Sequence, residues 1–221
     1  MAQMARGKLK NKTELLEKAL TGLIGPHQKM LLETQLSHIE FLDEQIQKLG
    51  EEIVIRMRPF KKAIEALDGI PGISRINAEQ ILCETGIDMS RFPTDKHFAS
   101  WAALCPGNNE SGGKRKSGKT RKGNMTLKAA LTQAAISASR TKSTYFNTLY
   151  HRIAARRGKN KANIAVAHAI LVTIYHMLKE GSSYHDLGTN HFDEINKEAI
   201  LKRSIKRIQS LGFIVTIESA A

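Results

Sequence analysis

Residues 160–180 read NKANIAVAHAILVTIYHMLKE, and this stretch indicates the fold class because apolar side chains occupy most of its helical faces. A helix that is apolar on most sides is normally buried at the centre of a protein. Its large apolar residues are Ile164, Val166, Ile170, Leu171, Ile174, Met177 and Leu178. We therefore expect a central core helix here, with Gly181 as the residue that ends it.

Further helices are predicted on both sides of this core helix. Residues 124–140 are rich in alanine and residues 143–157 end in a basic run, and both precede it. A basic amphipathic helix follows at 193–211, and GFIVTIE at 212–218 is the one convincing strand. A short helix is expected after Pro93, with the single tryptophan, Trp101, in the core. The fold class is therefore predicted to be mainly α.

The segment LDGIPGISRINAEQILCETG, at 67–86, predicts a helix-hairpin-helix motif. Gly69, Pro71 and Gly72 form its turn. In such a motif the backbone N–H groups of the turn can meet a DNA phosphate, so Gly69, Gly72 and Ser74 are candidate contacts. Ser74 stands where a second hairpin glycine is usual. The apolar face of the motif is expected to comprise Ile73, Ile76, Ile81 and Leu82. The alternative is a purely structural helical hairpin.

Residues 26–60 predict one long helix, which begins at Pro26 and is ended by Pro59. Its seam alternates spacings of three and four residues, as in a coiled coil. The seam consists of Leu32, Gln35, Ile39, Leu42, Ile46, Leu49 and Ile53. Either the helix pairs with another chain, or it packs on its own domain. We expect three regions: a basic segment at 1–25, the coiled-coil helix at 26–60, and a helical domain at 61–221.

The strong positive charge points to a polyanionic partner. The chain of 221 residues has 34 Lys and Arg against 21 Asp and Glu, a formal net charge of +13 with a pI near 9.8. Such an excess favours nucleic acid or an anionic membrane surface. A ribosomal or nucleoid-type binding role is the simplest interpretation of this charge. Aromatic residues are only 5%, so base stacking on an aromatic platform is not expected to dominate.

Cellular location is constrained by what the sequence lacks. No apolar run reaches the roughly 18 residues of a membrane span. The basic N-terminus has no apolar region typical of a secretion signal. Cys83 and Cys105 are isolated, so we expect reduced thiols in a cytoplasmic protein that makes no membrane contact. His168 and His176 are expected at the edge of the core, and no metal site is predicted.

The segment CPGNNESGGKRKSGKTRKGN, at 105–124, is predicted to be an irregular, exposed loop. Residues 113–120 match the phosphate-binding pattern GxxxxGK[ST], but no buried strand precedes them and no apolar helix follows. Nucleotide hydrolysis is therefore rejected.

The same loop contains a candidate nucleophile, Ser111. Gly112 and Gly113 follow it and would let a backbone approach closely. Serine is a weak nucleophile unless its surroundings stabilise developing negative charge. The loop supplies cations that could neutralise a phosphate: Lys114, Arg115, Lys116, Lys119, Arg121 and Lys122. The alternative from the residues alone is a flexible, solvated nucleic-acid-binding loop.

The segments 67–82, 99–124, 145–181 and 202–218 together resemble the C-terminal half of bacterial insertion-sequence transposases of the IS-one-ten (IS-one-one-six) group, the bridge-RNA-guided serine recombinases. The resemblance implies DNA transposition, with Ser111 attacking a DNA phosphate to form a phosphoserine link, and Ser117 as the fallback. It implies DNA, a noncoding bridge RNA and further copies of the chain (a dimer or tetramer formed through the coiled coil) as partners. It also implies a bacterial cytoplasmic, nucleoid-associated location.

The resemblance also implies an N-terminal RuvC-like domain whose acidic residues bind Mg²⁺, and no such domain precedes the coiled coil in this chain. We therefore expect no cofactor in the chain itself. The chain alone is expected to bind nucleic acid without completing the reaction, so its enzymatic activity is left open. The alternative is a non-enzymatic nucleic-acid-binding remnant of a truncated transposase.

Overall fold

The computed structural model describes most of the chain as two compact units, Met1–Arg58 and Pro59–Ala221. The described residues are 3, 5, 7–20, 22, 25–107, 109–120 and 122–216, without the side chains of Leu20, Asn109 and Arg115.

The first unit is dominated by α2, Pro26–Met57, which confirms the predicted long helix. Pro26 occupies its first turn, where the missing N–H costs nothing. A 3₁₀ turn at Gly7–Lys12 and α1, Thr13–Leu20, precede it. The sequence indicated only a basic segment here and missed α1, whose two turns are too short to carry a strong periodic signal.

The apolar seam of α2 is exposed to solvent. The exposed fractions of its six apolar members lie between 44% and 66%, and they are Leu32, Ile39, Leu42, Ile46, Leu49 and Ile53. Exposed ion pairs within the helix, such as Lys29–Glu33 and Arg56–Glu52, flank it. Exposed pairs of this kind contribute little to stability. The apolar stripe of α2 is therefore left exposed to solvent, with no other element of this unit packed over it in the described part of the chain.

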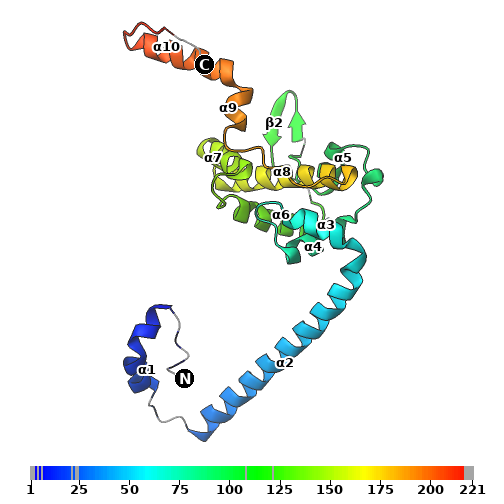
Figure 1. Ribbon diagram of the computed structural model, residues 1–221, viewed down its shortest axis with the longest axis vertical. Coiled ribbons are helices and arrows are strands. Elements are labelled where there is room, and N and C mark those ends of the chain that lie inside the picture. Colours follow the sequence, from blue (N-terminus) through cyan, green and yellow to red (C-terminus); the bar gives the residue numbers. More distant parts are fainter. Residues whose placement is uncertain are drawn as a thin grey trace. The chain divides into compact units, whose positions relative to one another are not determined.

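The second unit is built around α8, Lys159–Glu180 (Figure 1). α5 (Asp95–Trp101), α6 (Met125–Ala138) and α7 (Tyr145–Arg157) pack against it. Its fully buried side chains include Val166, Ile170, Leu171, Ile174 and Tyr175. The predicted central core helix is confirmed, and Gly181 ends it in the left-handed conformation.

By length and mean hydropathy α8 also meets the criterion for a membrane span, contrary to the expectation that no segment would. Among the described residues it is the one helix that does so. Its buried residues lie against neighbouring helices of the unit, and a core helix passes the same test. We therefore describe α8 as the core helix.

The predicted helical hairpin is present as α3, Lys61–Asp68, and α4, Arg75–Thr85. Ile73, Ile81 and Leu82 are buried as expected. The expectation for Ile76 is wrong, because its side chain is 78% exposed. Ile76 lies two positions before the buried Ala78, and residues two apart on a helix point to nearly opposite sides.

Trp101 is 42% exposed and does not lie in the core as predicted. It is the last residue of α5, where one side of the indole contacts Phe98 and Phe92, with ring centroids 6.0 and 5.4 Å away. Because Trp101 lies at the end of a helix, the rest of its ring is exposed to solvent. Phe98 is the fully buried member of this group.

The tail forms α9, His191–Ile195, and α10, Lys197–Ser210, in place of one continuous helix. The strand expected at 212–218 is absent from 213–216, and residues 217 and 218 lie outside the described part. A single apolar run of this length has no second strand beside it to satisfy its backbone groups. None of the side chains of α10 is buried.

Candidate nucleic-acid interface at the β-hairpin

Residues 105–124 contain a β-hairpin, which corrects the prediction of an irregular loop. β1, Asn109–Ser111, pairs antiparallel with β2, Lys114–Ser117. Gly112 and Gly113 connect them with φ of +59° and +71°. A two-residue turn with both φ positive matches the twist of the strands, and a Gly-Gly pair adopts it without a steric cost. The sequence did not predict this hairpin because its strands are polar and lack the apolar alternation by which strands are recognised.

The register of the hairpin selects which cation lies beside Ser111. Ser111 is directly opposite Lys114, and Glu110 is opposite Arg115. Side chains of opposed residues share one face of the ribbon, with Cβ atoms about 4.5–5.5 Å apart. Ser111 therefore shares a face with Lys114, while Glu110 points to the other face. Figure 1 shows the ribbon projecting from the helices of its unit.

A bulge interrupts the ladder between Asn109 and Glu110, next to the Glu110–Arg115 pair. Asn109 is opposite Ser117, so Lys116 has no residue opposite it. Bulges increase the local twist and redirect side chains. Below the bulge, the pairing continues in an isolated bridge between Pro106 and Thr120, and the Gly107 N–H donates to the Lys119 carbonyl at 2.8 Å.

The base of the hairpin is joined to the helices. Lys128 of α6 donates from Nζ to Thr120 Oγ1 at 2.5 Å. Asn124, the N-cap of α6, accepts from the Leu127 N–H and donates to Glu84 of α4. These bonds hold the second leg of the ribbon against the helices, and the Gly107–Lys119 bond joins the first leg to the second.

Gly123 has a packing role at this base. A Cβ on Gly123 would lie 2.4 Å from the Cβ of Ala103, so only glycine allows the chain to pass. By contrast, a Cβ on Gly112 or Gly113 would meet nothing within 4 Å. The tip is therefore sterically open and the base is closely packed.

The two candidate serines differ in their surroundings. Ser111 is exposed, and its hydroxyl has no hydrogen-bond partner within the described chain. Ser117 is half-buried, and its Oγ accepts from the Lys119 N–H at 3.2 Å. A hydroxyl that already organises its own loop is less available for attack, so the geometry favours Ser111 over Ser117.

The predicted cations are distributed along the ribbon. Lys114, Lys116, Lys119 and Lys122 are exposed, and none forms an ion pair with a carboxylate of the described residues. The Arg115 side chain and Arg121 lie outside the described part. Unpaired lysines on a projecting ribbon leave their charge available to an anionic ligand.

The helical hairpin positions its candidate residues differently. Gly72 has φ of +91°, and a Cβ there would lie 2.3 Å from the Ala134 carbonyl oxygen of α6. The Ile73 N–H already donates to the Ile70 carbonyl at 3.0 Å. The close approach that requires glycine at this position is therefore to α6.

Ser74 caps α4 by accepting from the Asn77 N–H at 3.4 Å, which gives it a structural role as well. Gly69 is exposed. Asn77 in turn donates from Nδ2 to the Ala130 carbonyl of α6 at 3.2 Å. Whether Gly69, Gly72 and Ser74 also contact a phosphate stays a prediction.

An open cavity of about 840 Å³ lies between the base of the hairpin and the first turns of α8. It brings Lys119 next to residues that the sequence did not single out for binding, Asn160 and Lys161. Its lining residues are Leu104, Pro106, Gly118, Lys119, Thr120, Asn160, Lys161, Ile164, Ala165 and His168. The basic run that ends the segment 143–157, just before α8, was the one sequence signal near this site.

His168 reaches this cavity from the edge of the core, as expected. It is half-buried. Loss of hydration lowers the pKa of its imidazole, and nearby Asp95 opposes that shift. His168 is therefore neutral at neutral pH. His176 is exposed and lies 3.3 Å from Glu180 on the same helix.

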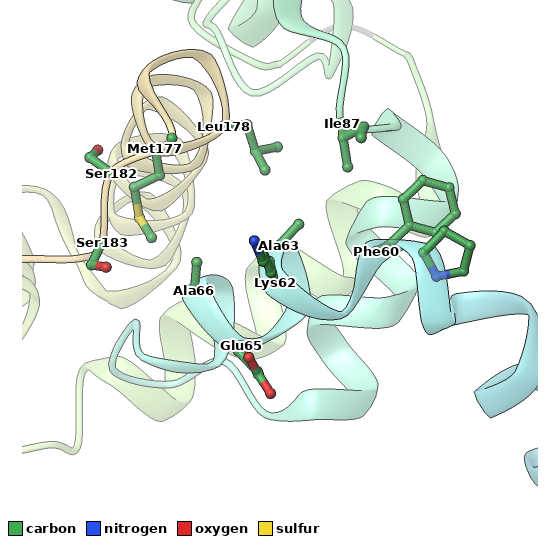
Figure 2. A pocket seen from close by; sticks show the side chains of 12 residues that line it. Phe60, Lys62, Ala63, Glu65, Ala66, Ile87, Met177, Leu178, Ser182 and Ser183 are labelled. Atoms are coloured by element: carbon green, nitrogen blue, oxygen red, sulfur yellow. The ribbon is translucent and has the colours of Figure 1, made fainter.

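A second cavity, of about 610 Å³, lies between α3 and the end of α8. Figure 2 shows Met177 and Leu178 on one side, with Phe60, Ala63 and Ala66 on the other. Its walls are mainly apolar and include no cysteine or histidine. Its charged lining residues are Lys62 and Glu65, of opposite sign, so the cavity lacks the excess of cations found around the hairpin.

Two other chemistries do not fit the described residues. No group of three or more His, Cys, Asp or Glu side chains within this part of the chain could hold a metal ion, so no step is assigned to Mg²⁺. The pattern at 113–120 forms the turn and outer strand of a hairpin, and α6 begins only at Met125. A phosphate-binding loop requires a strand that leads directly into a helix.

Comparison with known families agrees with the resemblance drawn from the sequence. Residues 64–151 match the Transposase IS116/IS110/IS902 family. The matched region begins within α3, contains α4, the β-hairpin with Ser111, and α6, and ends within α7. A search of curated proteins finds no match.

Proposed function

We propose that this chain is the nucleic-acid-binding and serine-bearing part of a DNA transposase or recombinase. The family match supports DNA transposition and DNA as the partner. The observation that carries the finer proposal is the tip of the hairpin, where exposed Ser111 lies opposite Lys114 beside an open Gly-Gly turn. The turn beside the serine has no side chain of its own, so a phosphate can approach Ser111 with Lys114 as the neighbouring cation.

In the proposed step, Ser111 Oγ attacks the phosphorus of a DNA phosphodiester. The Oγ–P bond forms and the bond from phosphorus to one deoxyribose oxygen breaks. The hydroxyl proton passes, in the net reaction, to the departing sugar oxygen. Lys114 is the cation on the same face of the ribbon, so it would stabilise the negative charge that develops on the phosphate. The open turn leaves room for the in-line approach.

The proposed partners include further copies of the chain and a guide RNA. The apolar seam of α2 is exposed along its length, and such a seam is buried when two helices pair. We propose that a dimer or tetramer forms through α2, with Gln35 as a polar residue that helps to set the register. The bridge RNA is proposed on the resemblance of the sequence alone.

The proposal is tested by trapping the covalent link. The chain is mixed with labelled donor and target DNA, bridge RNA, Mg²⁺ and a supplied RuvC-like domain, then denatured and separated on a gel. A protein–DNA adduct that survives denaturation is expected with the natural chain and with Ser117→Ala. It is expected to disappear with Ser111→Ala. An adduct that persists in Ser111→Ala would show that another residue is the nucleophile.

The second candidate function is nucleic-acid binding without chemistry. One observation favours it: no imidazole or carboxylate of the described residues accepts a hydrogen bond from Ser111 to activate it. This candidate predicts salt-dependent DNA binding, with no adduct under any of the conditions above. If about six phosphates are contacted, log K against log salt concentration falls with a slope near −5. A flat salt response would contradict both candidates.

A further inference from the structure

The cavity at the base of the hairpin has walls of two kinds. One side is aliphatic, formed by Leu104, Pro106, Ile164 and Ala165. The lining also includes three exposed polar residues, Lys119, Asn160 and Lys161. The volume of about 840 Å³ falls within the roughly 300–1,000 Å³ typical of sites for small organic ligands. Such a site suits a flat apolar group attached to an anion.

The charged side chains that line this cavity are basic, and Asp95 is the carboxylate that acts on His168 from outside the lining. None of its lining residues is acidic, and neither Lys119 nor Lys161 forms an ion pair within the described chain. Thr120 is already engaged by Lys128. His168, another lining residue, is half-buried, and neither of its ring nitrogens has a side-chain partner among the described residues. It can exchange a hydrogen bond with the edge of a ligand.

We propose that this cavity binds an unpaired nucleotide of the DNA held by the hairpin. The base would lie against the aliphatic wall, with its edge toward His168. Its phosphates would be neutralised by Lys119 and Lys161. This inference rests on the proposed function, because Lys119 belongs both to the leg of the hairpin and to the cavity.

The shape of the site explains why the nucleotide would be unpaired. A base within a duplex is covered on both faces by its neighbours, so it cannot place a face against a protein wall. Extruding it costs free energy, and the cost is least where the base has no pairing partner. The cavity should therefore distinguish bulged from fully paired DNA, whereas the lysines of the hairpin tip contact both.

The test compares two duplexes that are identical except for one unpaired deoxyadenosine. Affinities of the full chain are measured at fixed salt by fluorescence anisotropy. We expect the bulged duplex to bind about fivefold more tightly, at the lower end of what stacking a base on an aromatic side chain contributes, because the wall here is aliphatic. Equal binding of both duplexes would overturn the cavity proposal and leave the proposed function intact. Binding of neither duplex would overturn both.

Variants locate the effect. Ile164→Trp fills the cavity and should reduce the preference for the bulge to about one, with paired-duplex affinity unchanged. Lys161→Gln should reduce the preference without changing the core, so it keeps the test valid if the tryptophan variant fails to fold. Lys142→Gln removes the same charge from an exposed site outside the cavity and should retain the preference. A preference that survives both cavity variants would contradict the proposal.

Discussion

Two glycine turns of this protein look alike in sequence and differ in their surroundings. The turn at Gly72 is closed, because α6 lies where a side chain would be. The turn at Gly112 and Gly113 is open, with nothing within 4 Å of a Cβ at either residue. Glycine is required at the first for packing, and at the second chiefly for backbone conformation.

The comparison separates two explanations for a glycine-rich, phosphate-facing motif. Lack of a side chain lets a backbone approach either a ligand or another part of the protein. In the closed turn, Gly72 lets the backbone approach another part of the protein, namely the Ala134 carbonyl and Ala138 of α6. Only the open turn combines glycine, an exposed hydroxyl and unpaired cations, so the binding proposal is centred there.

The largest expected effect is on folding. Gly72→Ala forces a Cβ against the backbone of α6 at positive φ, and we expect a loss of about 3 kcal/mol in the free energy of unfolding. Gly112→Ala meets only the conformational penalty, about 1 kcal/mol. Urea titration followed by circular dichroism compares the two variants. Equal losses of unfolding free energy in the two variants would show that the two glycines are packed equally closely.

The next effect is on binding. Replacing Lys114, Lys116 and Lys119 together with Gln should weaken DNA binding, and the salt slope should become shallower by about 0.9 for each phosphate that the variant no longer neutralises. Binding isotherms at several salt concentrations measure both. The matched control replaces Lys61, Lys96 and Lys142 with Gln, which removes the same charge elsewhere. An equal effect in the control would indicate general charge attraction and no specific role of the hairpin.

A smaller effect should define Ser74. Ser74→Ala removes the N-cap of α4 and should lower the free energy of unfolding by about 1 kcal/mol, while Ser74→Gly costs only a few tenths. DNA affinity should change little in either variant. Thermal unfolding and binding assays on the same samples separate the two roles. A loss of affinity in both variants without a loss of stability would instead assign Ser74 to the DNA interface.

The smallest effect is a pH dependence at His168. Burial lowers the pKa of this imidazole, so the unfolded chain binds the proton more readily than the folded chain. Stability from this source is complete above the ordinary value of 6.5 and is lost as the pH falls through the lowered pKa. His168→Gln should flatten the acid side of the stability profile. An unchanged profile would contradict this assignment.

Much of the helical fold could be predicted because the periodic spacing of apolar residues in a helix is visible within a single segment of sequence. The pattern at 160–180 predicted α8 closely, and the turn at 69–72 predicted the α3–α4 hairpin. The failures have physical causes. Ile76 and Trp101 are apolar residues at helix ends, where few neighbours exist to cover them. The β-hairpin was missed because its strands are short and polar.

The candidate site was predictable in its residue types but not in its arrangement. Ser111 and the cationic run were evident from local sequence, since charge and glycine content are properties of the chain itself. The pairing of Ser111 with Lys114 required the register of the hairpin. The cavity joins Lys119 to Lys161 across more than forty positions, which no local pattern encodes.

The helical class, the positive charge and the resemblance to insertion-sequence transposases were therefore evident before folding was considered, because each depends on composition or short-range spacing. Folding selects which glycine turn is open, which lysine lies opposite the serine, and where a cavity forms. Those features depend on backbone segments that meet only after folding, when α6 closes one turn and leaves the other exposed.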